Sequence, residues 1–163
     1  MRDMRLLLAI ALLGVGLLGG CGDDEIIQLF SRADCEKAVT AWAEAVLEGR
    51  LPDALEDTGT PFRFRSRLWG NPGEVKKGLG LQLADVKARL GAANHMECWP
   101  FLGLKDGDWP RGEVRDVSHV GVQPDGYVVV LKKSERTQQA LMTLVVNPSP
   151  QRERLVIQGI DPQ

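Results

Sequence analysis

The sequence is poor in aromatic side chains and has no marked excess of either charge sign. Phenylalanine, tryptophan and tyrosine make up 6% of its 163 residues, whereas apolar residues reach 44% and charged residues 26%. These proportions are typical of one globular domain and exclude a disordered, collagenous or disulfide-dense chain. The formal charge is -2 and no long basic run occurs, so we expect no nucleic acid partner.

Complete catalytic and cofactor motifs are also missing. The sequence contains no GxSxG nucleophile elbow, no phosphate-binding P-loop, no dinucleotide-binding glycine pattern and no HExxH helix. These absences remove the commonest hydrolase, nucleotide-binding and zinc-protease interpretations. We therefore expect no cofactor, and an enzyme would need a less familiar constellation of residues.

The N-terminal segment has the form of an export signal. Arg2 and Arg5 precede a run of apolar residues and glycines over positions 6–20, which is a positively charged region followed by a short apolar region. A run of this length is too short for a permanent membrane span, because a helix needs roughly 20 residues to cross the hydrocarbon layer.

The apolar run ends in Leu18-Gly19-Gly20-Cys21, which resembles the lipobox of bacterial lipoproteins. In that family the peptide bond before the cysteine is cut and the cysteine carries the acyl chains. The resemblance implies that acylated Cys21 makes the lipid bilayer a partner, since two or more acyl chains hold a protein there stably. An ordinary secretory leader with an incidental cysteine is the alternative.

The lipobox also implies the domain organisation and the location. A signal peptide would cover residues 1–20, a lipidated tether residues 21–29, and one domain residues 30–163. The protein would belong to the bacterial cell envelope, with its domain facing the periplasm. The choice between the inner and the outer membrane stays open.

Helical patterns dominate the first half of the domain. Ser31 and Asp34 form a capping-box variant, after which apolar residues recur at helical spacing until Gly49. A short second helix is predicted over residues 52–56, and residues 61–69 alternate with period two, as in a half-buried strand.

The rest of the domain is predicted to be mostly strand. A glycine-rich turn over residues 70–80 leads into a third helix that ends at Gly91, and residues 92–112 have the composition of an ordered but irregular loop. Four β-like runs follow, over residues 113–122, 127–133, 140–147 and 154–161. Turn residues at 123–126 predict a hairpin between the first two runs, and a second turn at 147–150 separates the last two.

This order of elements resembles the nuclear-transport-factor-two-like fold, a cystatin-like roll that also houses the SnoaL-like polyketide cyclases and the ketosteroid isomerases. The resemblance covers about residues 30–161 and rests on the order of elements. The local segments that fit it are the first helix at 38–45, which runs into residues 48–55, and the closing strand at 154–160. It implies an α+β class with a curved antiparallel sheet, packed by N-terminal helices into a cone that encloses a cavity. The isomerases place a tyrosine on the helical side, whereas the only tyrosine here, Tyr127, opens a predicted strand.

Two cysteines remain once Cys21 is assigned to lipid. In an oxidising compartment Cys35 and Cys98 are a candidate disulfide, and two buried free thiols are the alternative, since Cys35 lies on the apolar face of the first predicted helix. His95 and Cys98 have a ligand-like spacing, but a structural zinc site needs four ligands. Because only His119 and Cys35 could complete it, we expect no metal site.

Two further groups of polar residues are candidate sites. Arg63, Arg65 and Arg67 would lie about 6 to 7 Å apart on one face of the predicted strand, a geometry that can hold a phosphate or carboxylate, although a plain solvent-facing surface is the alternative. Asp116 could orient His119 as a base, but their odd separation places them on opposite faces of a regular strand.

The sequence therefore predicts a membrane-anchored envelope lipoprotein whose domain binds a small apolar ligand or an envelope protein without catalysis. The alternative is a small enzyme of isomerase or dehydratase type that uses Asp116 or His119 in a conical pocket, and a third class is a structural envelope component. The lining of the cavity discriminates between them. Convergent polar groups favour the enzyme, an apolar lining favours binding, and a filled interior favours structure or interaction.

Overall fold

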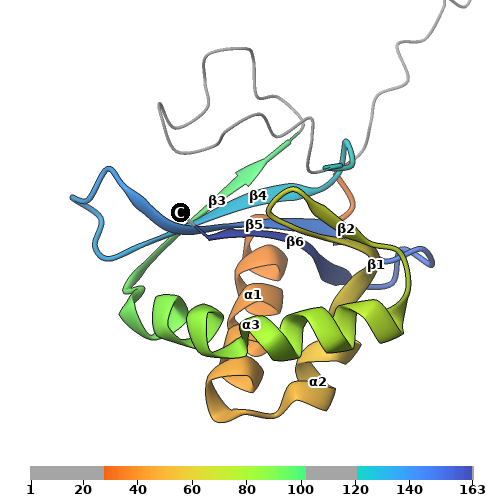
Figure 1. Ribbon diagram of the computed structural model, residues 1–163. Coiled ribbons are helices and arrows are strands. Elements are labelled where there is room, and N and C mark those ends of the chain that lie inside the picture. Colours follow the sequence, from red (N-terminus) through yellow and green to blue (C-terminus); the bar gives the residue numbers. More distant parts are fainter. Residues whose placement is uncertain (1–27, 102–120, 163) are drawn as a thin grey trace, which may run out of the picture.

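The computed structural model describes residues 28–101 and 121–162, which form three helices on one face of a six-stranded sheet (Figure 1). The α+β class is thereby confirmed. The helices are α1 (Arg32–Glu48), α2 (Leu51–Glu56) and α3 (Pro72–Ala92). The strands are β1 (Thr58–Phe64), β2 (Arg67–Trp69), β3 (His95–Pro100), β4 (Tyr127–Lys132), β5 (Ala140–Pro148) and β6 (Leu155–Pro162). Within the described residues, no helix is both long and apolar enough to cross a membrane.

The sheet is mixed, with the order β2-β1-β6-β5-β4-β3, and it is open. Four neighbouring pairs are antiparallel, but β1 runs parallel to β6. The expectation of a purely antiparallel sheet is therefore wrong at this pair. The physical reason is that β1 and β6 come from opposite ends of the domain, so no tight turn imposes an antiparallel direction on them.

The caps of α1 are those that the sequence predicts. Ser31 Oγ accepts a hydrogen bond from the Asp34 backbone N–H at 3.2 Å, while the Asp34 carboxylate accepts one from the Ser31 backbone N–H at 2.8 Å. Gly49 ends the helix in the left-handed conformation, with φ of 79°, which glycine adopts without the strain of a side chain.

The third helix begins earlier than predicted, because α3 includes most of the stretch expected to be a glycine-rich turn. Asn71 caps the helix by accepting a hydrogen bond from the Glu74 backbone N–H at 3.0 Å, and Pro72 occupies the first turn. These starting signals and the buried Val75 and Leu79 outweigh the unfavourable helix propensity of the glycines.

Two predictions about strands are wrong. Residues 61–69 form a hairpin of β1 and β2 rather than one strand, because the chain turns at Arg65, whose φ is 53°. The stretch expected to be an irregular loop contains β3, which pairs with β4 along its whole length. The hydrogen bonds and the apolar surface of β4 thus impose an extended conformation on a segment that lacks a clear period of its own.

The predicted strands at 127–133, 140–147 and 154–161 are confirmed as β4, β5 and β6. Most of the predicted strand at 113–122 lies outside the described residues, Gly121 and Val122 are not in a strand, and β4 pairs with β3 and β5. Asn147 belongs to β5 instead of to a turn, and its buried side chain donates to Gln158 Oε1 at 2.7 Å.

The space between the helices and the sheet is filled by large apolar side chains. The largest of these side chains are at most 2% exposed, namely Trp42, Phe62, Leu79, Tyr127, Met142, Leu144, Ile157 and Ile160. A smaller cluster lies on the other face of the sheet and consists of Val128, Val130 and Ala140. The part of the fold that the resemblance assigns to a conical cavity is therefore occupied by core residues.

Candidate functional site

The predicted lipid site and the predicted acid-base pair cannot be placed in the fold. Cys21, Asp116 and His119 all lie outside the described residues. The candidates that can be placed are the two cysteines, the three arginines, Tyr127 and the neighbours of His95.

Cys35 on α1 and Cys98 on β3 are both buried and both free in this structure, so the predicted disulfide is not formed in it. The fold nevertheless brings the two side chains together. A hydrogen bond with Cys98, followed by burial, raises the pKa of the Cys35 thiol strongly, which keeps it protonated and unreactive. Oxidation of the pair during export stays a prediction.

The three arginines do not form a stripe. In the hairpin register Phe64 lies opposite Arg67, and Arg63 lies opposite Leu68. Because opposed residues share a face of the sheet, Arg63 and Arg67 point to opposite faces. Arg65 occupies the turn, where its guanidinium lies over the Phe64 ring and 3.9 Å from the Asp85 carboxylate. The structure therefore does not bring the three together as an anion site.

Tyr127 has a structural partner. Its side chain is buried, and its hydroxyl donates a hydrogen bond to the Phe30 backbone carbonyl at 2.7 Å. Burial is the first cause that raises the pKa of the phenol, and the neighbouring Cys35 and Cys98 act in the same direction. The hydroxyl thus ties the segment before α1 to the sheet.

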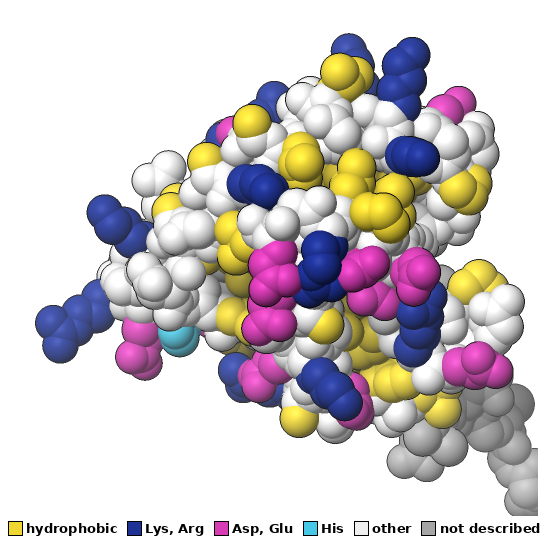
Figure 2. Space-filling view, turned by 90° about the horizontal axis from the view of Figure 1, so that it is seen from below, with side chains coloured by type: hydrophobic (Ala, Val, Ile, Leu, Met, Phe, Trp, Pro, Cys, Tyr) yellow, Lys and Arg dark blue, Asp and Glu magenta, His cyan; other side chains and the backbone are white. Residues whose placement is uncertain are grey.

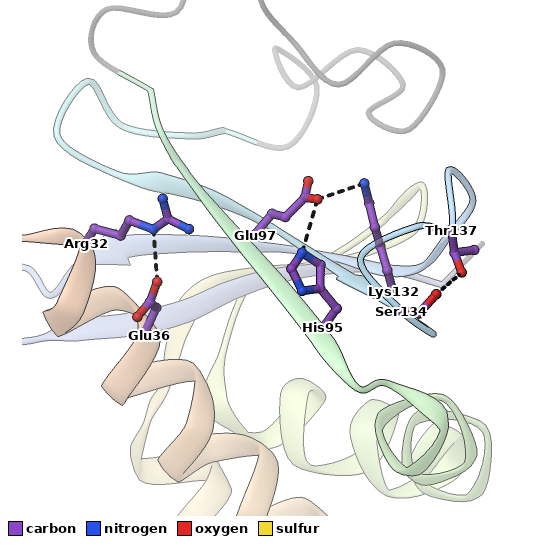
Figure 3. Close-up of polar contacts among 7 residues, drawn as sticks. All are labelled: Arg32, Glu36, His95, Glu97, Lys132, Ser134 and Thr137. Carbon is purple, nitrogen blue, oxygen red and sulfur yellow. Dashed lines mark hydrogen bonds and ion pairs between the residues drawn. The ribbon is translucent and has the colours of Figure 1, made fainter.

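A polar cluster that the sequence did not reveal lies on β3 and β4 (Figure 3). Glu97 Oε1 accepts a hydrogen bond from Lys132 Nζ at 3.0 Å, and His95 Nε2 lies 3.3 Å from the same oxygen. The lysine side chain is only 9% exposed and the glutamate 20%. This cluster was missed because β3 was not predicted, and without β3 nothing places residues 95 and 97 on one face.

The electrostatics of the cluster favour a permanent ion pair. Burial pushes the pKa of Glu97 up, but the hydrogen bond and positive charge of Lys132 outweigh it, so the pKa lies below its usual value. A general acid at neutral pH needs a raised carboxyl pKa. Glu97 is therefore ionised and already engaged, an arrangement that joins β3 to β4.

A groove lies between α1, the end of α3 and β3, and we call it the α1–β3 groove. It has a volume of about 320 Å³ and a mostly apolar lining. Its lining residues are Val39, Thr40, Ala43, Glu44, Leu47, Leu90, Ala93, Asn94, His95, Met96 and Leu131.

The helix α1 supplies one wall of this groove through its periodicity. Val39, Ala43 and Leu47 follow one another at intervals of four residues, which places them on one side of the helix. Leu47 is 42% exposed. Strand β3 supplies the opposite wall, and it ends the order of strands in the sheet, so its outer edge has no strand partner among the described residues.

Comparisons with known proteins return nothing that could assign this groove. No protein-family model matches the chain, and neither the curated proteins nor the solved structures contain a significant match. The interpretation of the site therefore depends on its own chemistry.

Proposed function

We propose that the chain is a bacterial envelope lipoprotein, anchored through acylated Cys21, whose periplasmic domain is a binding module without catalytic activity. The leader pattern and the lipobox support the anchor. The order of helices and strands supports a divergent, cone-shaped roll of the nuclear-transport-factor-two-like type, in which core side chains occupy the cone.

The α1–β3 groove is the observation that carries the binding function. Its volume of about 320 Å³ lies at the lower end of the range for ligand sites. Its apolar walls favour an apolar group, and the edge of β3 beside it offers backbone N–H and C=O groups to an extended segment. We therefore assign the groove to an extended, apolar segment of another envelope protein, with a small apolar ligand as the competing occupant.

The test of the groove uses two substitutions on the same helix. Ala43 lines the groove, whereas Ala41 is exposed on α1 outside it, so Ala43→Trp fills the groove and Ala41→Trp is a matched control. A photoreactive side chain introduced at Thr40 is expected to cross-link one envelope protein in the native host, and Ala43→Trp is expected to abolish the adduct. Equal cross-linking with Ala43→Trp and Ala41→Trp would contradict a role for the groove.

The small-ligand occupant and the anchor have separate readouts. The small ligand is favoured if no protein adduct forms while an apolar dye such as anilinonaphthalene sulfonate binds the wild type. The dye should then not bind Ala43→Trp. For the anchor, Cys21→Ser should remove the acyl chains and release the protein from the membrane fraction. Unchanged membrane association of that variant, with normal export, would refute lipidation.

A further inference from the structure

A second hollow lies at the other edge of the sheet, between β2 and α3, and we call it the β2–α3 hollow. It has a volume of about 340 Å³. Its floor is the indole of Trp69, which stacks on the rings of Phe62 at 5.6 Å and Phe64 at 5.5 Å between centroids. Gly78 of α3 allows the indole to lie against the helix, because a Cβ at this position would overlap the ring.

Leu81 of α3 lies beside this floor and is unusually exposed. It is 75% exposed, more than the other large apolar side chains that lie open among the described residues, Leu68 at 56%, Leu29 at 48% and Leu47 at 42%. Leu68 also contributes to the lining, but it pairs with Arg63 in the hairpin, so its side chain points to the other face of β2 from Trp69. A single exposed leucine is ordinary on a protein surface, but Leu81 next to an aromatic floor forms a small apolar site.

Two cations lie among the lining residues of the hollow. They are Arg67 and Lys77, and Lys76 precedes Lys77 on α3 and is exposed. Within the described part of the chain, neither Arg67 nor Lys77 has an ion-pair partner. The one acidic residue in the lining, Glu74, accepts a hydrogen bond from the Gly70 backbone N–H at 2.7 Å. The lining thus carries two cations against one carboxylate, in a chain whose formal charge is -2.

The helical side of the molecule carries hydrophobic, basic and acidic side chains close to one another, as Figure 2 shows. An exposed leucine next to an aromatic floor and two cations matches the interfacial region of a bilayer, where apolar side chains enter the acyl boundary and cations meet phosphates.

We propose that the β2–α3 hollow docks on the surface of an anionic phospholipid bilayer. The inference rests on the proposed function, because acylated Cys21 would hold the domain at a membrane. Residues 21–27 can extend to at most about 25 Å. Tethering at this distance raises the local concentration of lipid, so a weak contact is enough to orient the domain. Charge complementarity favours anionic lipid, and an acidic protein is the rival occupant that the experiment must separate.

The experiment uses the full chain in vesicles whose lipids carry bromine on the acyl chains, because bromine quenches tryptophan fluorescence at short range. One vesicle type is phosphatidylcholine alone, and the other is phosphatidylcholine with phosphatidylglycerol in equal parts. Stronger quenching in the anionic vesicles is expected, since Trp69 lies at the proposed contact. Leu81→Glu should abolish the difference, and Lys77→Glu should weaken the apparent contact by about fivefold or more, because it removes a positive charge and adds a negative one.

Matched controls make the same chemical changes elsewhere. Leu47→Glu alters an exposed leucine of the α1–β3 groove, and Lys133→Glu alters an exposed lysine after β4, and both should leave the quenching unchanged. Equal quenching in neutral and anionic vesicles would overturn the proposal, and would leave an acidic protein as the remaining occupant. Equal effects of test and control variants would overturn it as well. Failure of the proposed anchor has a separate readout, because the Cys21→Ser variant would then remain in the membrane fraction.

Discussion

The packing of Trp69 against α3 makes a sharp prediction about Gly78. In Gly78→Ala the new methyl group would overlap the indole, which cannot move away freely because it is stacked on Phe62 and Phe64. Overpacking of this kind costs about 1–3 kcal/mol. Replacing a glycine by alanine inside a helix contributes about 0.5–1 kcal/mol in the opposite direction.

Gly80 provides the matched control in the same helix. A Cβ at Gly80 would lie 4.0 Å from the Leu51 side chain, which is an ordinary contact. Gly80→Ala should therefore stabilise the domain by about 0.5–1 kcal/mol. Because the propensity gain is common to both variants, it cancels in their difference, which isolates the steric cost at about 1–3 kcal/mol.

The assay is urea unfolding of the wild type and both variants, followed by far-ultraviolet circular dichroism. The free energy of unfolding should fall in the order Gly80→Ala, wild type, Gly78→Ala, with similar dependence on urea in all three. If Gly78→Ala stabilises the domain as much as Gly80→Ala does, the indole is not held against α3. Trp69 would then not form the floor of the β2–α3 hollow, and the proposed lipid contact would lose its geometric basis.

Two further predictions concern the cysteines and the ion pair. Folded, reduced protein should react with iodoacetamide at neither Cys35 nor Cys98, because both are buried and the pKa of the Cys35 thiol is raised. Exported protein that is unfolded without reductant should show no free thiol if the pair oxidises, whereas two reactive thiols would retire the disulfide. For Glu97, the folded pKa lies below the usual value, so the ion pair contributes stability above the unfolded pKa and loses it as the pH falls through the folded one. Glu97→Gln should lose on the order of 1–3 kcal/mol at neutral pH, and its urea stability should depend less on acid. An unchanged acid profile would show that the pair with Lys132 contributes nothing.

Local signals in the sequence were sufficient for α1 and for the central strands. The caps of α1 act through hydrogen bonds and dihedral angles within a few residues, at Ser31, Asp34 and Gly49. Their effect therefore does not depend on distant contacts. The continuous apolar runs of β4 and β5 are too short for buried helices, and turn residues flank them. The predictions of α1, β4 and β5 agree with the structure, whereas the glycines of residues 70–80 predicted a turn where most of the segment belongs to α3.

Signals that depend on distant partners were misread. The alternation over residues 61–69 continues across a turn at Arg65, and only the pairing of β1 with β2 reveals that the turn reverses the face of Arg67. Strand β3 owes its conformation to β4, which follows it after a long stretch of chain. For the same reason the ion pair of Glu97 with Lys132 was invisible, since it exists only across that pairing.

The two hollows follow from how the sheet is buried. Side chains of the central strands are covered on both faces: Val129 and Leu144 point to the helices, while Val128 and Val130 lie in the cluster on the other face, and all four are 0% exposed. Strands that are apolar in a continuous run behave in this way, because neither face can remain in water. Partners can therefore reach the described part of the fold where the sheet ends, at the edge strands β2 and β3. Each edge strand forms a hollow with the neighbouring helices, and the opposite character of their rims, cationic at β2 and largely apolar at β3, favours a lipid surface on one side and a protein segment on the other.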